Sequence, residues 1–258
     1  RLQKVLSSSL RAQSIPIFNV SALSGLNVNH LIEGLRSHTF LPQRNVAAPL
    51  LMYVDHCFSI KGQGTICTGT VVQGQLSLND TIEIPMIKEQ RKVKSMQMFR
   101  KPVQIVGMGD RVGVCVTQFN AKLLERGLLT KPGYLQPTYA ACVCLQRIQY
   151  YKQSIKSKSK LHLTVGHETV MVNLTLFKGN SLEESIFDPS QEYEYVEELE
   201  ASPDNLDFPI FALLEFEKPI YAPPAAIVIA SKLDMDIHSA SCRLAFWGQL
   251  QWSSHSSH

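Results

Sequence analysis

The chain has 258 residues, of which 45% are hydrophobic and 18% charged, and its net charge is +3. A chain of this length can bury a substantial core in one to three domains. No apolar run reaches the roughly 18 to 20 residues that would cross a bilayer, so we expect no membrane partner. Six cysteines without a regular framework indicate a reducing, cytoplasmic environment. Strand spacing favours a structural role over metal binding for Cys142 and Cys144.

The acidic residues are unevenly distributed. Residues 181–207 hold ten acidic residues and no lysine or arginine, which leaves 12 acidic against 25 basic residues in the rest of the chain. A body this basic indicates a polyanionic partner such as RNA, although any single lysine or arginine could simply solvate the surface. We interpret the acidic stretch as a surface loop or a disordered insertion.

The first 45 residues have the pattern of an α/β unit. Residues 1–14 are expected to end a helix and residues 15–20 to form a short buried strand. Asn27 is a candidate cap for a helix whose apolar side chains recur at helical spacing from Val28 to Leu35. A linker with two prolines, residues 40–49, follows. The chain begins with Arg1 and has no signal-peptide pattern, so we expect it to be a piece of a longer protein.

Short strand-sized runs separated by glycine, proline and asparagine turns dominate residues 46–137. A helical period is visible only briefly, over residues 121–129. Regular spacing of short strands is typical of a closed barrel. The predicted strands are residues 50–60, 65–73, 80–85, 91–99, 103–107 and 111–118.

A second β unit is predicted over residues 138–248, interrupted by an acidic insertion at residues 179–207. Residues 249–258 read as an unstructured tail. The fold class is therefore mainly β, with two consecutive β-barrels preceded by one strand and one helix of an α/β domain. The predicted strands of the second unit are residues 139–150, 160–166, 168–177, 208–218, 225–233 and 238–247.

Common catalytic motifs are missing from the sequence. It contains no phosphate-binding G-x-x-x-x-G-K-[ST] loop, no G-x-S-x-G and no H-E-x-x-H. We therefore predict neither a catalytic residue nor a metal site in this chain.

Two segments resemble the translational GTPases. Ser21, Ala22 and Leu23, placed before a helix, are similar to the loop whose backbone N–H groups contact guanine in that family. The pattern from Phe58 to Gly69, followed by Gly109-Asp110-Arg111-x-Gly113, resembles the second domain of these factors. The resemblance implies barrels of the translation-elongation-factor type, and a remnant of a GTPase domain at residues 1–45.

Within that family the chain is most similar to the eukaryotic selenocysteine-specific elongation factors. The resemblance runs from the end of the GTPase domain through domains two and three, and stops at the acidic insertion and after Gly248. It rests on the phrases VDHCFSIKGQGT, KVKSMQMF, GDRVGVCVTQF, LLERGL, VGHETVM, LLEFEKP and CRLAF.

The resemblance implies a factor that binds selenocysteinyl-tRNA and delivers it to the ribosome at UGA codons. Its expected partners are that tRNA, the ribosome and a protein that binds the selenocysteine-insertion-element RNA. GTP and Mg²⁺ are the cofactors implied for the full-length parent. Because this chain has no P-loop, we expect it alone to bind neither and to hydrolyse no GTP; whether it counts as an enzyme stays open.

Asp55, His56 and Arg111 are implied to form part of a selenocysteine pocket. A selenol is a stronger acid than a thiol, so its anion would be favoured by Arg111 and by a hydrogen-bonding His56. Asp55 could orient those donors and bind the aminoacyl amino group. The alternative is structural: Arg111 would simply form an ion pair with Asp55 or Asp110.

Further residues are candidates for contact with tRNA. Glycines in a turn let a backbone approach the acceptor end, and lysines on strand edges suit phosphate contact, although a solvated strand face is an equal alternative. For the two histidines a structural role is the favoured alternative. The candidates are Lys61, Gly62, Gly64, Arg91, Lys92, Lys94, Lys158, Lys160, His162 and His167.

Two other functions remain open from the sequence. One is another tRNA-carrying translational GTPase, such as the initiation-factor subunit that binds initiator tRNA. The other is a non-enzymatic protein-interaction barrel that uses the acidic stretch for docking.

Overall fold

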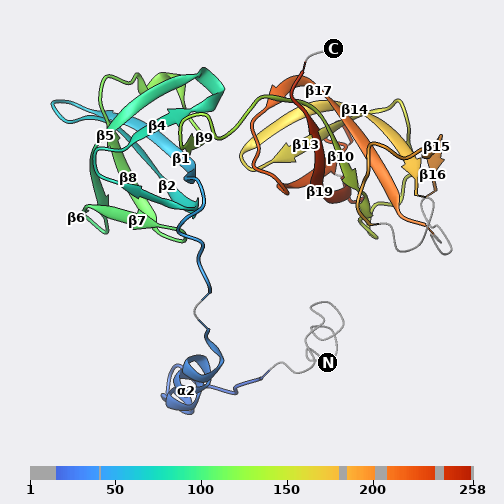
Figure 1. Ribbon diagram of the computed structural model, residues 1–258. Helices are drawn as coiled ribbons and strands as arrows, with labels where there is room; N and C mark the ends of the chain where they lie inside the picture. The colour runs from blue at the N-terminus through green and yellow to red at the C-terminus, as the bar shows by residue number, and fades with distance from the viewer. Residues whose placement is uncertain (1–15, 41, 180–184, 201–207, 236–240, 257–258) are drawn as a thin grey trace. The chain divides into compact units, whose positions relative to one another are not determined.

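The computed structural model describes residues 16–40, 42–179, 185–200, 208–235 and 241–256. The chain divides into two units, residues 1–43 and 44–258. Figure 1 shows the helix α2 (Val28–His38) among the described residues of the first unit, and two groups of strands in the second. The predicted helix end at residues 1–14 lies outside the described residues.

The first unit differs from its prediction in two ways. Of the strand predicted at residues 15–20, the described residues 16–20 form no strand, and an isolated bridge joins Ser21 to Leu26. Asn27 precedes α2 with a left-handed φ of 58°, but its side chain does not cap the helix. The amide instead donates a hydrogen bond to the Asn19 carbonyl at 3.0 Å, which ties the loop to the helix start.

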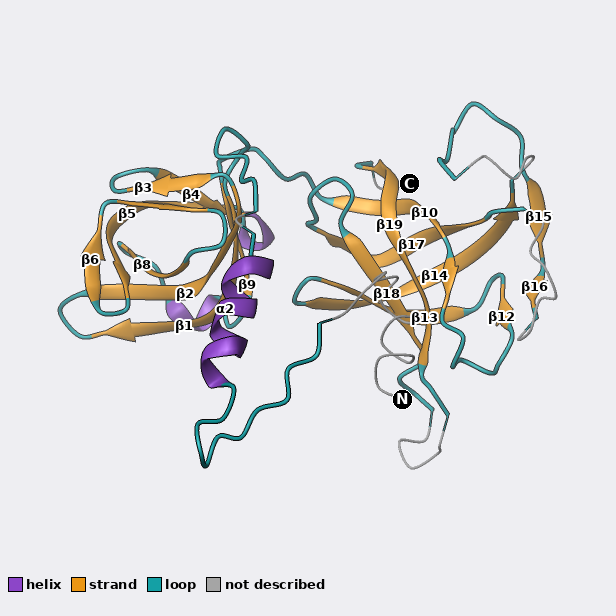
Figure 2. Cartoon of the chain, turned by 90° about the horizontal axis from the view of Figure 1, so that it is seen from below, coloured by secondary structure: helices purple, strands orange, loops and turns teal. Residues whose placement is uncertain are grey.

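Six strands of the first barrel close into a ring in the order β4-β9-β1-β2-β8-β5, because β4 also pairs with β5. All the pairings are antiparallel, and Figure 2 shows the strands surrounding a common centre. The elements of this barrel are β1 (Leu51–Ile60), β2 (Gly64–Gln73), β3 (Gln75–Ser77), β4 (Thr81–Ile84), a 3-10 turn (Pro85–Ile87), β5 (Glu89–Met98), β6 (Lys101–Val103), β7 (Ile105–Gly107), β8 (Arg111–Val116), a second 3-10 turn (Ala121–Leu123) and β9 (Gly127–Thr130).

Alternation of side chains builds the core of this barrel. Along β2, every second residue from Thr65 to Val71 is buried while its neighbours are half-exposed. The buried set includes Cys67, which packs with Val54 and Val114 of the adjacent strands. Period-two burial is what a sheet closed around one core requires.

The predicted helical segment at residues 121–129 is wrong. Only Ala121–Leu123 forms a single 3-10 turn, and Gly127–Thr130 is the buried strand β9, which pairs with β1. The apolar residues Leu128 and Leu129 satisfied a helical period over a stretch too short to distinguish it from a buried strand.

The second barrel also closes with six strands, in the order β10-β17-β14-β13-β18-β19, with β19 pairing back to β10. Its core is a separate cluster that includes Val143, Leu163, Leu174 and Phe246. The elements are β10 (Thr138–Cys144), β11 (Gln146–Arg147), β12 (Ile155–Lys156), β13 (Lys160–Val165), β14 (Glu168–Lys178), β15 (Glu194–Val196), β16 (Glu198–Leu199), β17 (Ile210–Ile220), β18 (Ile227–Ser231) and β19 (Leu244–Ser254).

The predicted unstructured tail from residue 249 is wrong for residues 249–254. Strand β19 continues to Ser254, and Trp252 and Ser253 pair with Cys142 and Ala141 of β10. This pairing closes the barrel. Serine-rich composition suggested disorder, but the open edge of β10 supplies the hydrogen-bond partners that the segment needs.

The described residues of the acidic insertion include two short strands. Among the residues the structure describes there, β15 pairs with β14 and β16 pairs with β12. Phe187 and Tyr193 stack with ring centroids 5.2 Å apart, and both contact Phe211. The prediction of a surface loop or disordered insertion is therefore wrong for residues 194–199, which form strands, and aromatic residues between the acidic ones pack against the barrel.

The prediction of a mainly β fold with two closed barrels is confirmed. Within the described part of the chain, no helix is both long and apolar enough to span a membrane.

Candidate functional site

The centre of the candidate site is a β-bulge in β1. Val54 pairs with Gly69 and His56 pairs with the preceding Thr68, so Asp55 is an extra residue without a partner on β2. A bulge re-aims side chains by shifting the alternation of a strand. Val54 and Cys57 both pack on the barrel core, which leaves Asp55 and His56 between them outside it.

Asp55 and Arg111 form an ion pair across the sheet. Arg111 begins β8, where it pairs with Thr70 of β2, and its Nη1 reaches over that strand to Asp55 Oδ2 at 2.6 Å. Thr70 Oγ1 lies 3.5 Å from the same nitrogen. The Arg111 side chain is still 61% exposed, and its Nε and Nη2 bond to no described residue. Those donors are therefore available to an incoming anion.

His56 does not join this pair. It is exposed, and its ring forms no hydrogen bond or ion pair with any described residue. The structure therefore brings together two of the three residues predicted for the pocket, and their ion pair is the contact that the structural alternative also predicted.

His167 of the second barrel takes the place beside Asp55. Its Nε2 lies 3.5 Å from Asp55 Oδ1, and its ring packs edge-on against Tyr53 with centroids 5.1 Å apart. Gly166 allows this approach, because a Cβ there would lie 2.6 Å from the Tyr53 ring and its φ is +58°. His167 was predicted only as a tRNA contact; residues 112 positions apart carry no sequence signal of their proximity.

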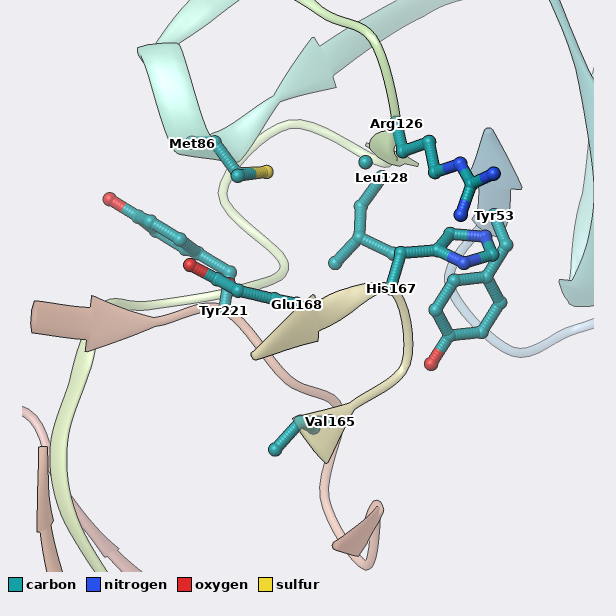
Figure 3. Close-up of a pocket in the computed structure, with 9 residues that line it drawn as sticks. Tyr53, Met86, Arg126, Leu128, Val165, His167, Glu168 and Tyr221 are labelled. Carbon is teal, nitrogen blue, oxygen red and sulfur yellow. The ribbon is translucent and has the colours of Figure 1, made fainter. Parts of the chain in front are cut away.

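A small cavity of about 90 Å³ adjoins this contact. Figure 3 shows the His167 ring next to Tyr53 and Arg126, and Glu168 next to Tyr221. Burial raises the pKa of the Glu168 carboxyl, opposed in part by Lys218. Burial likewise raises the pKa of Tyr53 and of Tyr221. Sequence reasoning missed Tyr53, Arg126, Glu168 and Tyr221, which nothing in their local patterns distinguishes.

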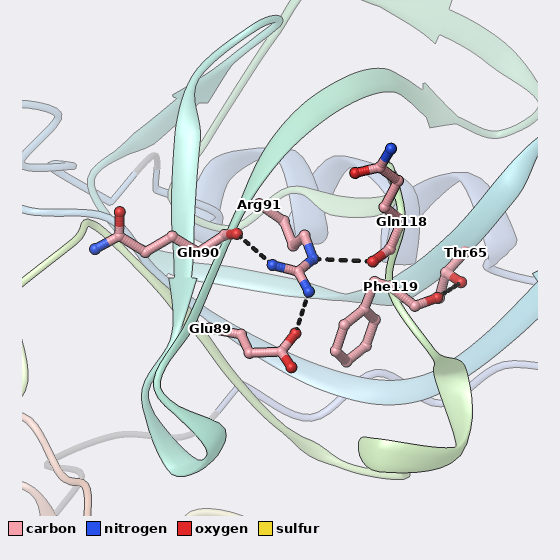
Figure 4. A network of polar contacts seen from close by, with 6 residues as sticks. All are labelled: Thr65, Glu89, Gln90, Arg91, Gln118 and Phe119. Atoms are coloured by element: carbon pink, nitrogen blue, oxygen red, sulfur yellow. Dashed lines mark hydrogen bonds and ion pairs between the residues drawn. The ribbon is translucent and has the colours of Figure 1, made fainter.

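Arg91 is held by its own barrel. Figure 4 shows its guanidinium bonded to the Glu89 carboxylate and to the Gln90 and Gln118 carbonyls, the last two at 2.7 and 3.2 Å. It also lies over the Phe119 ring, 5.9 Å from the centroid. Arg91 is therefore committed to structural contacts, which weakens its prediction as a phosphate contact.

Two of the other basic candidates on the first barrel, Lys61 and Lys94, lie at the β1–β2 turn. Lys61 and Gly62 are exposed, and Lys94 Nζ donates to the Gln63 carbonyl at 3.1 Å. Gly64 has a φ of +125°, which only glycine adopts readily. Lys92 is exposed on β5.

The candidates on the second barrel do not converge on Asp55. Lys160 Nζ forms an ion pair with Glu217 at 2.6 Å, and the ammonium of Lys158 lies 6.0 Å from the Tyr195 ring centroid. His162 is half-buried on β13, where its carbonyl accepts a bond from Ser231. Only His167 of this group reaches the site.

The loop at residues 21–23 belongs to the first unit. Ser21 N donates to the Leu26 carbonyl at 3.1 Å, and Ser21 Oγ accepts from Ser24 N at 3.3 Å. The backbone N–H groups of Ala22 and Leu23 donate to no described residue. Two free backbone donors in an exposed turn fit the expected contact with guanine. Among the described residues, no cluster of His, Cys, Asp and Glu could hold a metal ion.

Family models match both barrels. The third domain of the eukaryotic selenocysteine-specific elongation factor matches residues 142–248, and domain 2 of elongation factor Tu matches residues 64–127. The mouse selenocysteine-specific elongation factor is 42% identical over 287 aligned positions, which cover 97% of this chain and 49% of the mouse protein. The chain belongs to the selenocysteine-specific elongation factor family. It spans about half the length of the mouse factor.

Archaeal members of the family are also similar. The selenocysteine-specific elongation factor of Methanocaldococcus jannaschii is 29% identical over 181 residues, covering 69% of this chain and 39% of the relative. The crystal structure of SelB from Methanococcus maripaludis in the apo form matches with a TM-score of 0.79 and 26% identity, over 98% of this chain and 54% of that one. The same factor bound to the GTP analogue GppNHp matches with a TM-score of 0.76.

Proposed function

We propose that this chain is the tRNA-carrying part of a translation elongation factor specific for selenocysteinyl-tRNA. The factor would deliver that tRNA to the ribosome at UGA codons in a GTP-dependent manner, in the cytoplasm. Family membership supports the class of protein. The ion pair between Asp55 and the exposed Arg111 is the observation that supports selenocysteinyl-tRNA as the substrate.

The selectivity we propose rests on charge. The selenol of selenocysteine is largely ionised near neutral pH, whereas a serine hydroxyl is neutral. Arg111 has unused donors that could bind the selenolate, and Asp55 would hold the guanidinium in place or accept from the aminoacyl amino group. A neutral seryl group would leave those donors unmatched as the site closes, which penalises its binding.

GTP and Mg²⁺ would bind to the P-loop of a GTPase domain. These 258 residues contain no P-loop motif. The chain's own contribution to nucleotide binding would be the N–H groups of Ala22 and Leu23, directed at the base. We propose that residues 1–45 belong to that domain, that residues 46–137 form domain two, and that domain three begins at residue 138.

The tRNA body would lie on the basic surface. Lys61 and Lys94 lie at the β1–β2 turn, where an acceptor-end phosphate could be bound without sequence readout, and Lys92 is exposed on β5. His167 contacts Asp55 and so would act on the aminoacyl site rather than on the tRNA body. The ribosome and a protein that binds the insertion-element RNA are further proposed partners.

Replacement of Arg111 by alanine in the full-length factor tests the pocket. We expect affinity for selenocysteinyl-tRNA to fall by about tenfold or more, the size of one lost charge-assisted bond. Affinity for the seryl form of the same tRNA should change little. Filter-binding titrations with both aminoacyl forms measure the two effects, and Arg100→Ala, at an exposed turn of the same barrel, is the equal-charge control.

Equal losses for the two aminoacyl forms would overturn the proposed selectivity. Preference for initiator tRNA would indicate the initiation-factor alternative. Binding to a protein but to no tRNA at low salt would indicate the interaction-barrel alternative, because phosphate contacts weaken steeply as salt rises.

A further inference from the structure

Two cysteines face each other across the first hairpin. Cys57 of β1 and Cys67 of β2 are directly paired, and their sulfur atoms lie 3.6 Å apart. Two residues along the same face, Ser59 Oγ and Thr65 Oγ1 are 3.2 Å apart. The two strands therefore bring opposed side chains into direct contact along this face.

The environments of the two thiols differ. Cys67 is fully buried in the barrel core, whereas Cys57 is only half-buried. The hydrogen bond between them lowers the pKa of the Cys57 thiol, and the same bond together with burial raises the pKa of the Cys67 thiol. Cys57 is thus the thiol that a small solute can reach and that ionises first.

We propose that Cys57 and Cys67 are a peroxide-reactive dithiol that closes to an intrachain disulfide between β1 and β2. The Cys57 thiolate attacks one oxygen of hydrogen peroxide, so that an S–O bond forms and the O–O bond breaks. Cys57 becomes a sulfenic acid, and the leaving hydroxide takes up a proton to become water. The Cys67 thiol then attacks the Cys57 sulfur, and the sulfenic oxygen leaves as a second water. In total, two thiols lose two hydrogens and one peroxide becomes two waters.

Closing the bond requires only a small movement. A disulfide holds its sulfur atoms about 2.05 Å apart, so the two atoms must approach by about 1.5 Å, which side-chain rotation can supply. The link would tie β1 to β2 next to the bulge, since Asp55 and Gly69 are each two residues away. It would also close the loop that carries Lys61 and Gly62.

Cys115 provides a matched control. It lies on β8 opposite Ile66, whereas Val114 is opposite Cys67, so alternation places the Cys115 side chain on the other face of the sheet. It is also buried, and its sulfur is 3.5 Å from the Gln63 carbonyl. Because Cys115 is near the pair but lies on the other face of the sheet, it tests whether the disulfide depends on opposed side chains or on proximity alone.

The test is peroxide treatment of the full-length protein that contains this chain, followed by peptide mapping without reduction. We expect a peptide pair joined through Cys57 and Cys67, which dithiothreitol separates again. Cys57→Ser should abolish the link and leave Cys67 as a thiol. Cys67→Ser should leave sulfenic acid on Cys57, trapped by dimedone, and Cys115→Ser should form the link as the native protein does.

Other products would overturn the proposal. A bond from Cys57 to Cys115, a bond only between molecules, or over-oxidised Cys57 beside an intact Cys67 thiol would each show that Cys67 does not resolve the sulfenic acid. Loss of the link in Cys115→Ser would show that the pair does not react by itself. Recovery of both thiols unmodified after treatment would do the same.

Discussion

A single residue, Gly69, makes the bulge at Asp55 possible. A Cβ built on Gly69 would lie 1.8 Å from the Tyr53 carbonyl oxygen, closer than any pair of non-bonded atoms can come. The backbone of β1 thus comes closest to β2 at a position without a side chain. Gly69 is the reason that Asp55 and His56 can both lie outside the core.

Replacement of Gly69 by alanine should therefore be costly. We expect the free energy of unfolding to fall by about 3 kcal/mol, since the methyl group meets backbone rather than a movable side chain. Gly107→Ala is the control: its nearest neighbour would be 3.9 Å away, and we expect a change within about 0.5 kcal/mol. Urea denaturation of both variants measures the difference, and equal stability of the two would contradict the close approach.

The hairpin between β5 and β6 shows strain at the element scale. Its loop has only two residues, Phe99 and Arg100, because Met98 pairs directly with Lys101. Both loop residues have positive φ, 48° and 64°, as the mirror-image turn of a tight hairpin requires. Neither residue adopts this conformation readily, and Phe99 is 89% exposed, so packing does not compensate.

The double change Phe99→Asn and Arg100→Gly should stabilise the chain. Asparagine and glycine are the residues that this turn favours, and we expect a gain of about 1 kcal/mol in the free energy of unfolding. Phe99→Ala removes the ring without relieving the backbone, so it should give no gain. Chemical denaturation compares the variants, and a gain from Phe99→Ala alone would point to the ring rather than the turn.

The two barrels contact each other through side chains from both. Tyr53, Leu128 and Tyr221 pack beside a cavity whose wall includes Glu168. Burial raises the pKa of this carboxyl above its ordinary value of 4.5. The folded chain therefore holds the Glu168 proton more tightly than the unfolded chain does.

The raised pKa of Glu168 predicts the direction in which pH changes the free energy of unfolding. The contribution of Glu168 to stability is fully present below pH 4.5 and is lost as pH rises through the higher folded value. Glu168→Gln should remove this dependence and raise the free energy of unfolding at neutral pH. Denaturation of both proteins across that range measures it; the same slope in both would exclude Glu168 as the source. Glu217→Gln, at an exposed ion pair, is the control.

The sequence was enough to predict the two barrels, most of their strands and the family, but not β9 or the end of β19. Alternating apolar residues and glycine turns are local signals, and the motifs around Asp55 and Arg111 are contiguous. Such signals are set by neighbours in the chain and so can be read without the fold.

Which of these residues contact one another depends on the tertiary structure. His167 joins Asp55 from the other barrel, whereas the neighbouring His56 forms no hydrogen bond or ion pair with any described residue. Ser253 and its neighbours become a strand because β10 offers an unpaired edge. These outcomes depend on hydrogen bonds and contacts between residues more than a hundred positions apart, which no local pattern encodes.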